Sequence, residues 1–160
     1  MDPFLSTIIG GGIAIAGGAG TQWVMHHLTV THRRRTLAYA LSGEIASICA
    51  IAHKRKYLEN MKDMKKAIEQ DQPTYPFKVS ITQNYFTIFN ENAKDIGLLP
   101  PECAEHTARF YVQTKSLIED FTNPPESPNE AIVLLEMDIK LLEDTLKLGD
   151  SLKQELQRIR

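Results

Sequence analysis

Residues 4–25 read FLSTIIGGGIAIAGGAGTQWVM, and this stretch decides the fold because no charged side chain interrupts it. As a helix, about 22 residues extend about 33 Å, which matches a bilayer hydrocarbon core of about 30 Å. The few Ser and Thr side chains can return their hydroxyls to carbonyls of their own helix, so lipid tolerates them. The stretch therefore predicts a single transmembrane helix.

The flanks of this stretch predict its orientation. Asp2 is the only charge before it, whereas Arg33, Arg34 and Arg35 follow it. Trp23 stands where an aromatic ring would meet the lipid headgroups. By the positive-inside rule the N-terminus lies outside and the rest of the chain is cytoplasmic, so we expect a single-pass protein of the inner (plasma) membrane.

Small residues recur at four-residue spacing along this predicted span. The two series are Gly10, Ala14 and Gly18, and Gly12, Ala16 and Gly20. Since lipid supplies no hydrophobic force between helices, close backbone approach across small residues is what holds them together. We predict that these residues pack against a second copy or a partner's span. A plain Gly-rich anchor and a membrane-perturbing glycine-zipper oligomer are the alternatives.

Three other interpretations of the stretch are weaker. A cleaved signal peptide would need a basic n-region, which is missing, although residues 14–16 match the small-x-small cleavage pattern. A buried helix of a soluble protein would carry six glycines, at about 1 kcal/mol each relative to alanine. A phosphate-binding loop would need the motif GxGxxG or GxxxxGKS/T, and neither motif occurs in this stretch.

The rest of the chain has a different composition. All 18 Lys and Arg, and every acid except Asp2, lie at residues 33–160, and the formal net charge of the chain is −2. This balance argues against a nucleic-acid partner, and two cysteines are too few for a disulfide scaffold or a Cys-rich zinc module. We assign residues 1–32 to the anchor and its interface, and residues 33–160 to a cytoplasmic domain.

Apolar residues in the cytoplasmic domain recur at helical spacing. In the first expected helix, at residues 36–70, they are Leu37, Leu41, Ile45, Ile48, Ala52, Met61, Met64 and Ile68. This helix should continue from the membrane span, since residues 26–36 contain no Pro or Gly. The basic clusters at residues 53–56 and 62–66 predict its solvated face, or else a patch that faces lipid or an acidic partner.

Three further helices are expected. Thr82 is a candidate N-cap for a helix that should end at a left-handed Gly97, and Pro100 and Pro101 should start the next helix. After a Pro-rich linker, a last helix is predicted at residues 130–158. The fold class is therefore all-α, with an N-terminal transmembrane helix followed by an up-and-down bundle of about four helices.

The cytoplasmic domain offers little chemistry. A di-iron bundle would need Glu-x-x-His twice, and the pattern does not occur, so we expect no metal and no cofactor. Cys49 and Cys103 read as structural thiols, and His106 as an exposed first-turn residue. A helix start could lower the pKa of Cys103, so acyl transfer by Cys103 and His106 is a weak alternative. We expect no catalytic residue and no enzyme.

The densest polar-aromatic run lies at residues 84–92. We expect Asn84 and Asn92 to bind backbone and to hold the Pro-rich segment 73–82, which should lie extended against the bundle. The alternative is a partner surface formed by Asn84, Asn90 and Asn92.

The order of several short motifs carries a resemblance. After the Gly-rich span and its arginines these are GEI (43–45), RKY (55–57), YF (85–86), FNENA (89–93), IGLL (96–99) and FY (110–111). This order resembles a group of small bacterial single-pass membrane-anchored helical proteins. The motifs are structural and no activity is established for the group, so the resemblance implies an architecture and transfers no function.

These observations favour a non-enzymatic assembly or recruitment protein, an accessory subunit or scaffold. Its expected partners are the lipid bilayer and either a second copy or another membrane protein. The runner-up is an oligomeric membrane effector or sensor, in bacterial stress or phage defence, whose Gly-rich spans rearrange on a signal. A cryptic enzyme that uses a cavity of the bundle is the third hypothesis.

Overall fold

A computed structural model describes residues 3–70, 83–122 and 127–159, and the side chains of residues 22–70, 85–122 and 127–159. The described residues form only helices, which confirms the all-α prediction. In chain order these are α1 (Pro3–Lys54), α2 (Tyr57–Glu69), the 3-10 segment η1 (Gln83–Phe86), α3 (Thr87–Asn92), the 3-10 segment η2 (Ala93–Leu98), α4 (Pro101–Thr122) and α5 (Pro128–Gln157). The expected extended segment 73–82, with Thr82, lies outside the described residues.

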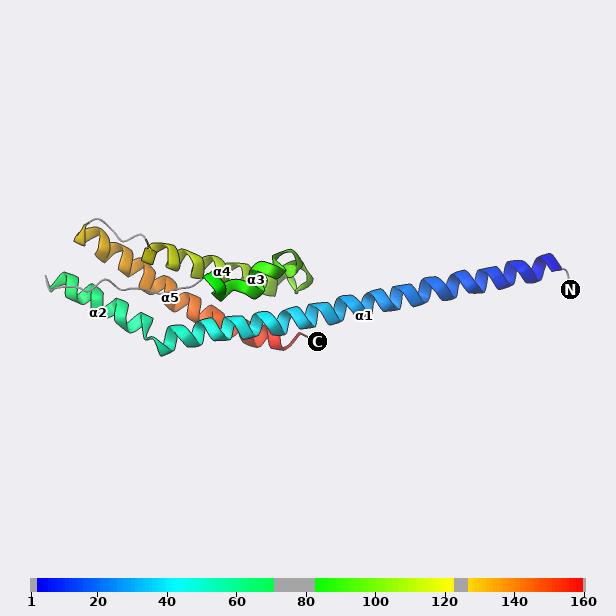
Figure 1. The fold of residues 1–160 in the computed structure, drawn as a ribbon, viewed down its shortest axis with the longest axis horizontal. Helices are drawn as coiled ribbons and strands as arrows, with labels where there is room; N and C mark the ends of the chain where they lie inside the picture. Colours follow the sequence, from blue (N-terminus) through cyan, green and yellow to red (C-terminus); the bar gives the residue numbers. More distant parts are fainter. Residues whose placement is uncertain (1–2, 71–82, 123–126, 160) are drawn as a thin grey trace.

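Helix α1 is a rod of 52 residues, about 78 Å long. Its N-terminal part projects beyond the other helices and its C-terminal part packs in the bundle (Figure 1). The expected continuation of the helix from residues 4–25 into the bundle is therefore confirmed. By length and composition alone, Gln22–Lys54 could cross a membrane, because one 18-residue window within it has a mean hydropathy of 1.2, and a third of that window is buried. All side chains at residues 22–29 are exposed, and the bundle first covers the helix at Val30.

Helix α5 is the centre of the bundle. It contacts α1, α2 and α4, and in Figure 1 it runs back along α1 and α2 in the opposite direction. Helix α3 and its flanking 3-10 segments contact α1, and η2 also contacts α4. The buried leucines of α5 are Leu135, Leu142, Leu146, Leu152 and Leu156.

The predicted unbroken helix at residues 36–70 is wrong, because the chain breaks between α1 and α2. Lys56 has φ 52° and ψ 41°, the left-handed conformation, and Asn60 Nδ2 donates to the Arg55 carbonyl across the break at 3.1 Å. Ala52 and Met61 are both buried. Nine residues of unbroken helix would turn them about 180° apart, so a straight helix could not bury both. The break restores the phase of the apolar stripe.

The segment around α3 also departs from expectation. Gly97 does not adopt the left-handed conformation, since Lys56 is the only described residue with positive φ. Instead η2 tightens into 3-10 geometry and ends where the Leu99 amide donates to the Ile96 carbonyl at 3.0 Å. The next helix starts at Pro101, as predicted. Helix α5 begins at Pro128, two residues before the predicted start at residue 130. Its N-cap is Ser127, whose hydroxyl accepts a bond from the Glu130 amide at 3.3 Å.

Candidate functional site

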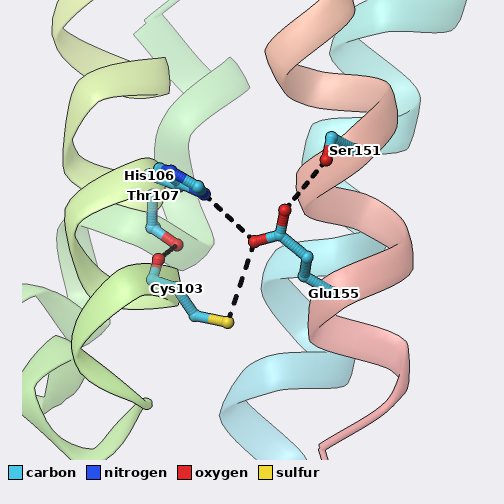
Figure 2. Close-up of polar contacts among 5 residues, drawn as sticks. All are labelled: Cys103, His106, Thr107, Ser151 and Glu155. Carbon is cyan, nitrogen blue, oxygen red and sulfur yellow. Dashed lines mark hydrogen bonds and ion pairs between the residues drawn. The ribbon is translucent and has the colours of Figure 1, made fainter.

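Polar side chains from α4 and α5 gather around the carboxylate of Glu155. The Nδ1 atom of His106 lies 3.0 Å from Glu155 Oε2, and the Cys103 thiol donates to the same oxygen across 4.0 Å. The Ser151 hydroxyl donates to Glu155 Oε1 at 2.8 Å. Figure 2 shows the carboxylate between the histidine and the thiol on one side and the serine on the other. We call Cys103, His106, Ser151 and Glu155 the α4–α5 polar cluster.

The electrostatics of this cluster keep the thiol protonated. Burial raises the pKa of Cys103, and the negative charges of Glu155 and Glu102 raise it further. The net pKa of Cys103 is therefore raised, in contrast to the possible lowering by a helix start. For Glu155, burial acts to raise the pKa, but the hydrogen bonds from His106 and Ser151 outweigh it, and the net pKa is lowered.

The arrangement suits a structural contact better than nucleophilic catalysis. A thiol nucleophile needs its base within hydrogen-bond reach, with a third group to orient that base. Here both Cys103 and His106 point to the same Glu155 oxygen, so the carboxylate is their shared acceptor. The expectation that His106 is a solvated first-turn residue is wrong, because its ring is half-buried against α5. Sequence spacing could not pair residues that lie 49 positions apart.

Thiol alkylation tests this interpretation. At pH 8 we expect iodoacetamide to modify Cys103 and Cys49 much more slowly in the folded protein than in urea, because burial raises both pKa values, that of Cys49 to about 11. Glu155→Gln should speed the alkylation of Cys103 a few-fold and leave Cys49 unchanged. Peptide mass spectrometry measures both rates. If folded Cys103 reacted faster than the denatured thiol, it would be an activated nucleophile and acyl transfer would be revived.

A second polar centre joins α1, α3 and α4. The carboxylate of Glu44 accepts the Ile88 amide at 2.7 Å, the Phe89 amide at 3.1 Å and the Tyr111 hydroxyl at 2.5 Å. The two amides belong to the first turn of α3, so Glu44 satisfies donors that have no partner within that helix. The Tyr111 ring stacks on Phe89 with 4.0 Å between ring centroids. Burial, followed by the bond to Glu44, raises the pKa of Tyr111, so the phenol stays a donor.

A buried acid lies between α4 and α5. Asp138 is only 3% exposed, and burial raises its pKa to about 7, with further contributions from the charge of Asp120 and a hydrogen bond to it. The pair therefore holds a proton at pH values where an exposed aspartate, with a pKa of about 4, has lost it. Nothing in the local sequence marks Asp138, which follows the exposed Met137 in a helix rich in charges.

The raised pKa of Asp138 predicts a pH dependence of stability. The folded state holds this proton up to about pH 7 and the unfolded state loses it near pH 4, so this contribution to stability falls as the pH rises between those values. Urea unfolding at pH 5, 6, 7 and 8 should show the fall. Asp138→Asn should remove it and leave the variant at least as stable as wild type at pH 8. Equal pH slopes for both proteins would contradict the prediction.

Three of the residues predicted at the membrane interface, Trp23, Arg33 and Arg35, each contact a different group of the protein. Trp23 is 70% exposed and stacks on His27 with 5.8 Å between centroids. Arg33 pairs with Asp95 of η2 at 3.0 Å, and the Arg35 guanidinium lies 5.6 Å from the Tyr39 ring centroid. The helix of the Gly and Ala series is described only as backbone, so their packing stays a prediction.

Two of the three amides of the predicted partner surface have described side chains, and each binds a different partner. Asn92 donates to the Ile88 carbonyl within its own turn at 2.8 Å, and exposed Asn90 accepts from Lys115 at 3.4 Å. The side chain of Asn84 lies outside the described ones, so its role stays a prediction.

In the described part of the chain, no three His, Cys, Asp or Glu residues are grouped so as to hold a metal ion. No family model, curated protein or solved structure matches this chain, so its function has to be argued from these residues.

Proposed function

We propose that this protein is a membrane-anchored assembly or recruitment protein whose bundle contacts its partner from the cytoplasmic side. The observation that carries the proposal is α1, whose N-terminal part projects from the bundle (Figure 1). Trp23, Met25 and Leu28 are 70%, 60% and 59% exposed. Exposed apolar residues in such a cluster mark a surface that lipid or protein covers.

The join between this projection and the bundle supports a rigid anchor. α1 has no break between its projecting and packed parts, and Leu37 and Ala38 are already buried in the bundle. The pair between Arg33 and Asp95 joins this level of α1 to η2. A rigid join would hold the bundle at a defined height and orientation below a bilayer, with the three arginines at the headgroups.

Extraction of membranes tests the anchor. We expect the full chain to remain in the membrane pellet at alkaline pH and to require detergent for release, because residues 4–25 would lie in hydrocarbon. A fluorescent protein fused to the C-terminus should be fluorescent, as a cytoplasmic C-terminus requires. A full chain that is released by alkali and stays monodisperse without detergent would contradict the proposal.

Photo-crosslinking in native membranes tests the recruitment. Val133 and Met137 lie one turn apart on α5 and are 59% and 64% exposed, so a photoreactive residue at position 137 should give one discrete adduct. The matched control is position 147, a charged and exposed position on the same helix. A single product at 137 and none at 147, identified by mass spectrometry, supports a defined partner. No adduct at native expression levels would contradict it.

A second candidate is a membrane effector or sensor whose spans rearrange, and the continuity of α1 favours it, because a rigid helix transmits a shift of the bundle to the projecting part. Induced expression should then depolarise cells. Gly12→Leu or Gly18→Leu should abolish the effect by blocking close helix approach, whereas Ile13→Leu should not. Cells that stay polarised with wild type under induction would refute this candidate.

A further inference from the structure

The turn at residues 93–101, which holds η2, lies at the end of the bundle from which α1 projects, where Figure 1 shows it in green. Arg33 of α1 pairs with Asp95 of η2 at 3.0 Å, so the turn lies level with Arg33. Residues 3–32 contain no Asp, Glu, Lys or Arg and, as continuous helix, extend about 45 Å. A bilayer with its headgroup regions is about 40–45 Å thick, so a span over this stretch would place Arg33 and the turn at the membrane surface.

The surface of this turn is suited to a bilayer. Asp95 is the only acid of the turn, and it is already paired with Arg33. Lys94 is its only base and is exposed. Gly97 and the prolines at residues 100–101 are exposed and uncharged. The turn therefore presents an uncharged surface and one cation at the level where headgroups would lie.

The C-terminal end of α5 brings a second cation to this end of the bundle. The Ser42 hydroxyl donates to the Lys153 carbonyl at 3.3 Å, where α5 runs antiparallel to α1 (Figure 1). Arg158, five residues beyond Lys153, therefore lies closer to the projecting part of α1, and it is exposed. Glu102, in the first turn of α4, brings an exposed acid to the same end, where basic side chains from α1, η2 and α5 outnumber it.

We propose that this end of the bundle is a second membrane contact, in which Lys94 and Arg158 bind anionic lipid headgroups. The inference rests on the membrane anchor proposed above, and it adds that the bundle lies against the bilayer. Each basic side chain near an anionic surface favours the contact by about fivefold. Because side chains at the interface set the tilt of a membrane helix, the contact would also fix the orientation of α1.

Fluorescence quenching on the full chain in nanodiscs tests the contact. The discs contain equal parts of phosphatidylcholine and phosphatidylglycerol, with nitroxides on choline headgroups that quench only tryptophans near them. Trp23 is the only tryptophan, so Trp23→Phe leaves the signal to a single new probe. Gly97 and Gly43 are exposed, and a Cβ atom at either would meet no atom within 4 Å, so Gly97→Trp and Gly43→Trp are matched probes. Gly97→Trp should be quenched at least about threefold more, because position 43 lies about 15 Å beyond Arg33 along α1.

Substitutions test the recognition of headgroup charge. The pair Lys94→Gln and Arg158→Gln should lower the quenching of the Gly97→Trp probe about fivefold or more, as should discs of phosphatidylcholine alone. The pair Lys54→Gln and Lys66→Gln removes the same charge at exposed positions and should change nothing, because Lys54 lies about 30 Å beyond Arg33 along α1.

Hydrogen exchange on the wild-type chain gives the same test without a probe, should a variant fail to fold. Amides at residues 93–101 should exchange more slowly in discs with phosphatidylglycerol than in discs of phosphatidylcholine alone. Amides at residues 128–140, at the opposite end of the bundle, should exchange equally in both.

The wild-type signal of Trp23 separates this inference from the anchor. Without quenching of Trp23 by a nitroxide on the acyl chain, the proposed anchor itself is wrong. If Trp23 is quenched but Gly97→Trp is quenched no more than Gly43→Trp, the anchor stands and the second contact is overturned. Equal quenching of Gly97→Trp with and without phosphatidylglycerol, or with and without the two cations, would also overturn it, because the headgroup charge is then not recognised.

Discussion

Gly149→Leu is expected to destabilise the bundle by more than about 3 kcal/mol, a large part of the roughly 5–15 kcal/mol that stabilises a typical domain. Gly149 is buried where α5 meets α1 and α4. A Cβ atom at this position would lie 2.6 Å from Cys49 Sγ, 2.8 Å from Phe110 Cε2 and 3.5 Å from Ile45 Cγ2. Since both nearest atoms belong to buried side chains, neither can move away without repacking three helices.

Gly43 provides the matched control, because it is also a glycine within a helix of the bundle. A Cβ atom at Gly43 would meet no atom within 4 Å, and the residue is exposed. Gly43→Leu should therefore stabilise α1 by up to about 1 kcal/mol through helix propensity. Urea unfolding followed by circular dichroism measures both variants. If Gly149→Leu were as stable as wild type, the close contact of α5 with α1 and α4 would be wrong.

Glu44→Ala is expected to cost about 3 kcal/mol, because it leaves three donors without their acceptor. Those donors are the amides of Ile88 and Phe89 and the hydroxyl of Tyr111. Tyr111→Phe removes one of the three bonds and leaves the other two, so it should cost only about 1–2 kcal/mol. Chemical unfolding gives the two free energies.

Hydrogen exchange locates the effect of Glu44. In Glu44→Ala the amides of Ile88 and Phe89 should exchange faster by a larger factor than those in the middle of α5, because their loss of protection is local. Glu105→Ala serves as a control at an exposed glutamate on α4. A Glu44→Ala variant with the stability of Glu105→Ala would show that the carboxylate does not hold α3 to α1 and α4.

The break at Lys56 shows what the spacing of apolar residues can predict about the helices and what it cannot. The apolar stripe of α1 runs to Ala52 and resumes at Met61, about 180° out of phase on an unbroken helix. The spacing of the apolar residues therefore indicated that the helix is interrupted between Ala52 and Met61. It did not indicate that the break falls at Lys56, because lysine does not favour the left-handed conformation. Burial of both stripes against α5 selected that conformation.

Sequence patterns could not predict the different surroundings of Gly43 and Gly149, nor the polar contacts of Glu155. Gly43 and Gly149 are indistinguishable by local propensity, and only the approach of Cys49 and Phe110 separates them. In the same way Glu155 resembles any exposed glutamate until His106 and Cys103 are placed beside it. Each distinction depends on a partner far away in the chain.

The sequence by itself determined the properties that follow from periodicity and composition. These are the charge-free N-terminal stretch, the apolar faces of the helices, the start of α4 at Pro101 and the all-α class. The tertiary structure alone decided which helix α5 packs against, where α1 ends, and which acids are buried. The physical reason is that backbone conformation responds mainly to neighbouring residues, whereas close packing, burial and pKa shifts depend on atoms that only the folded chain brings together.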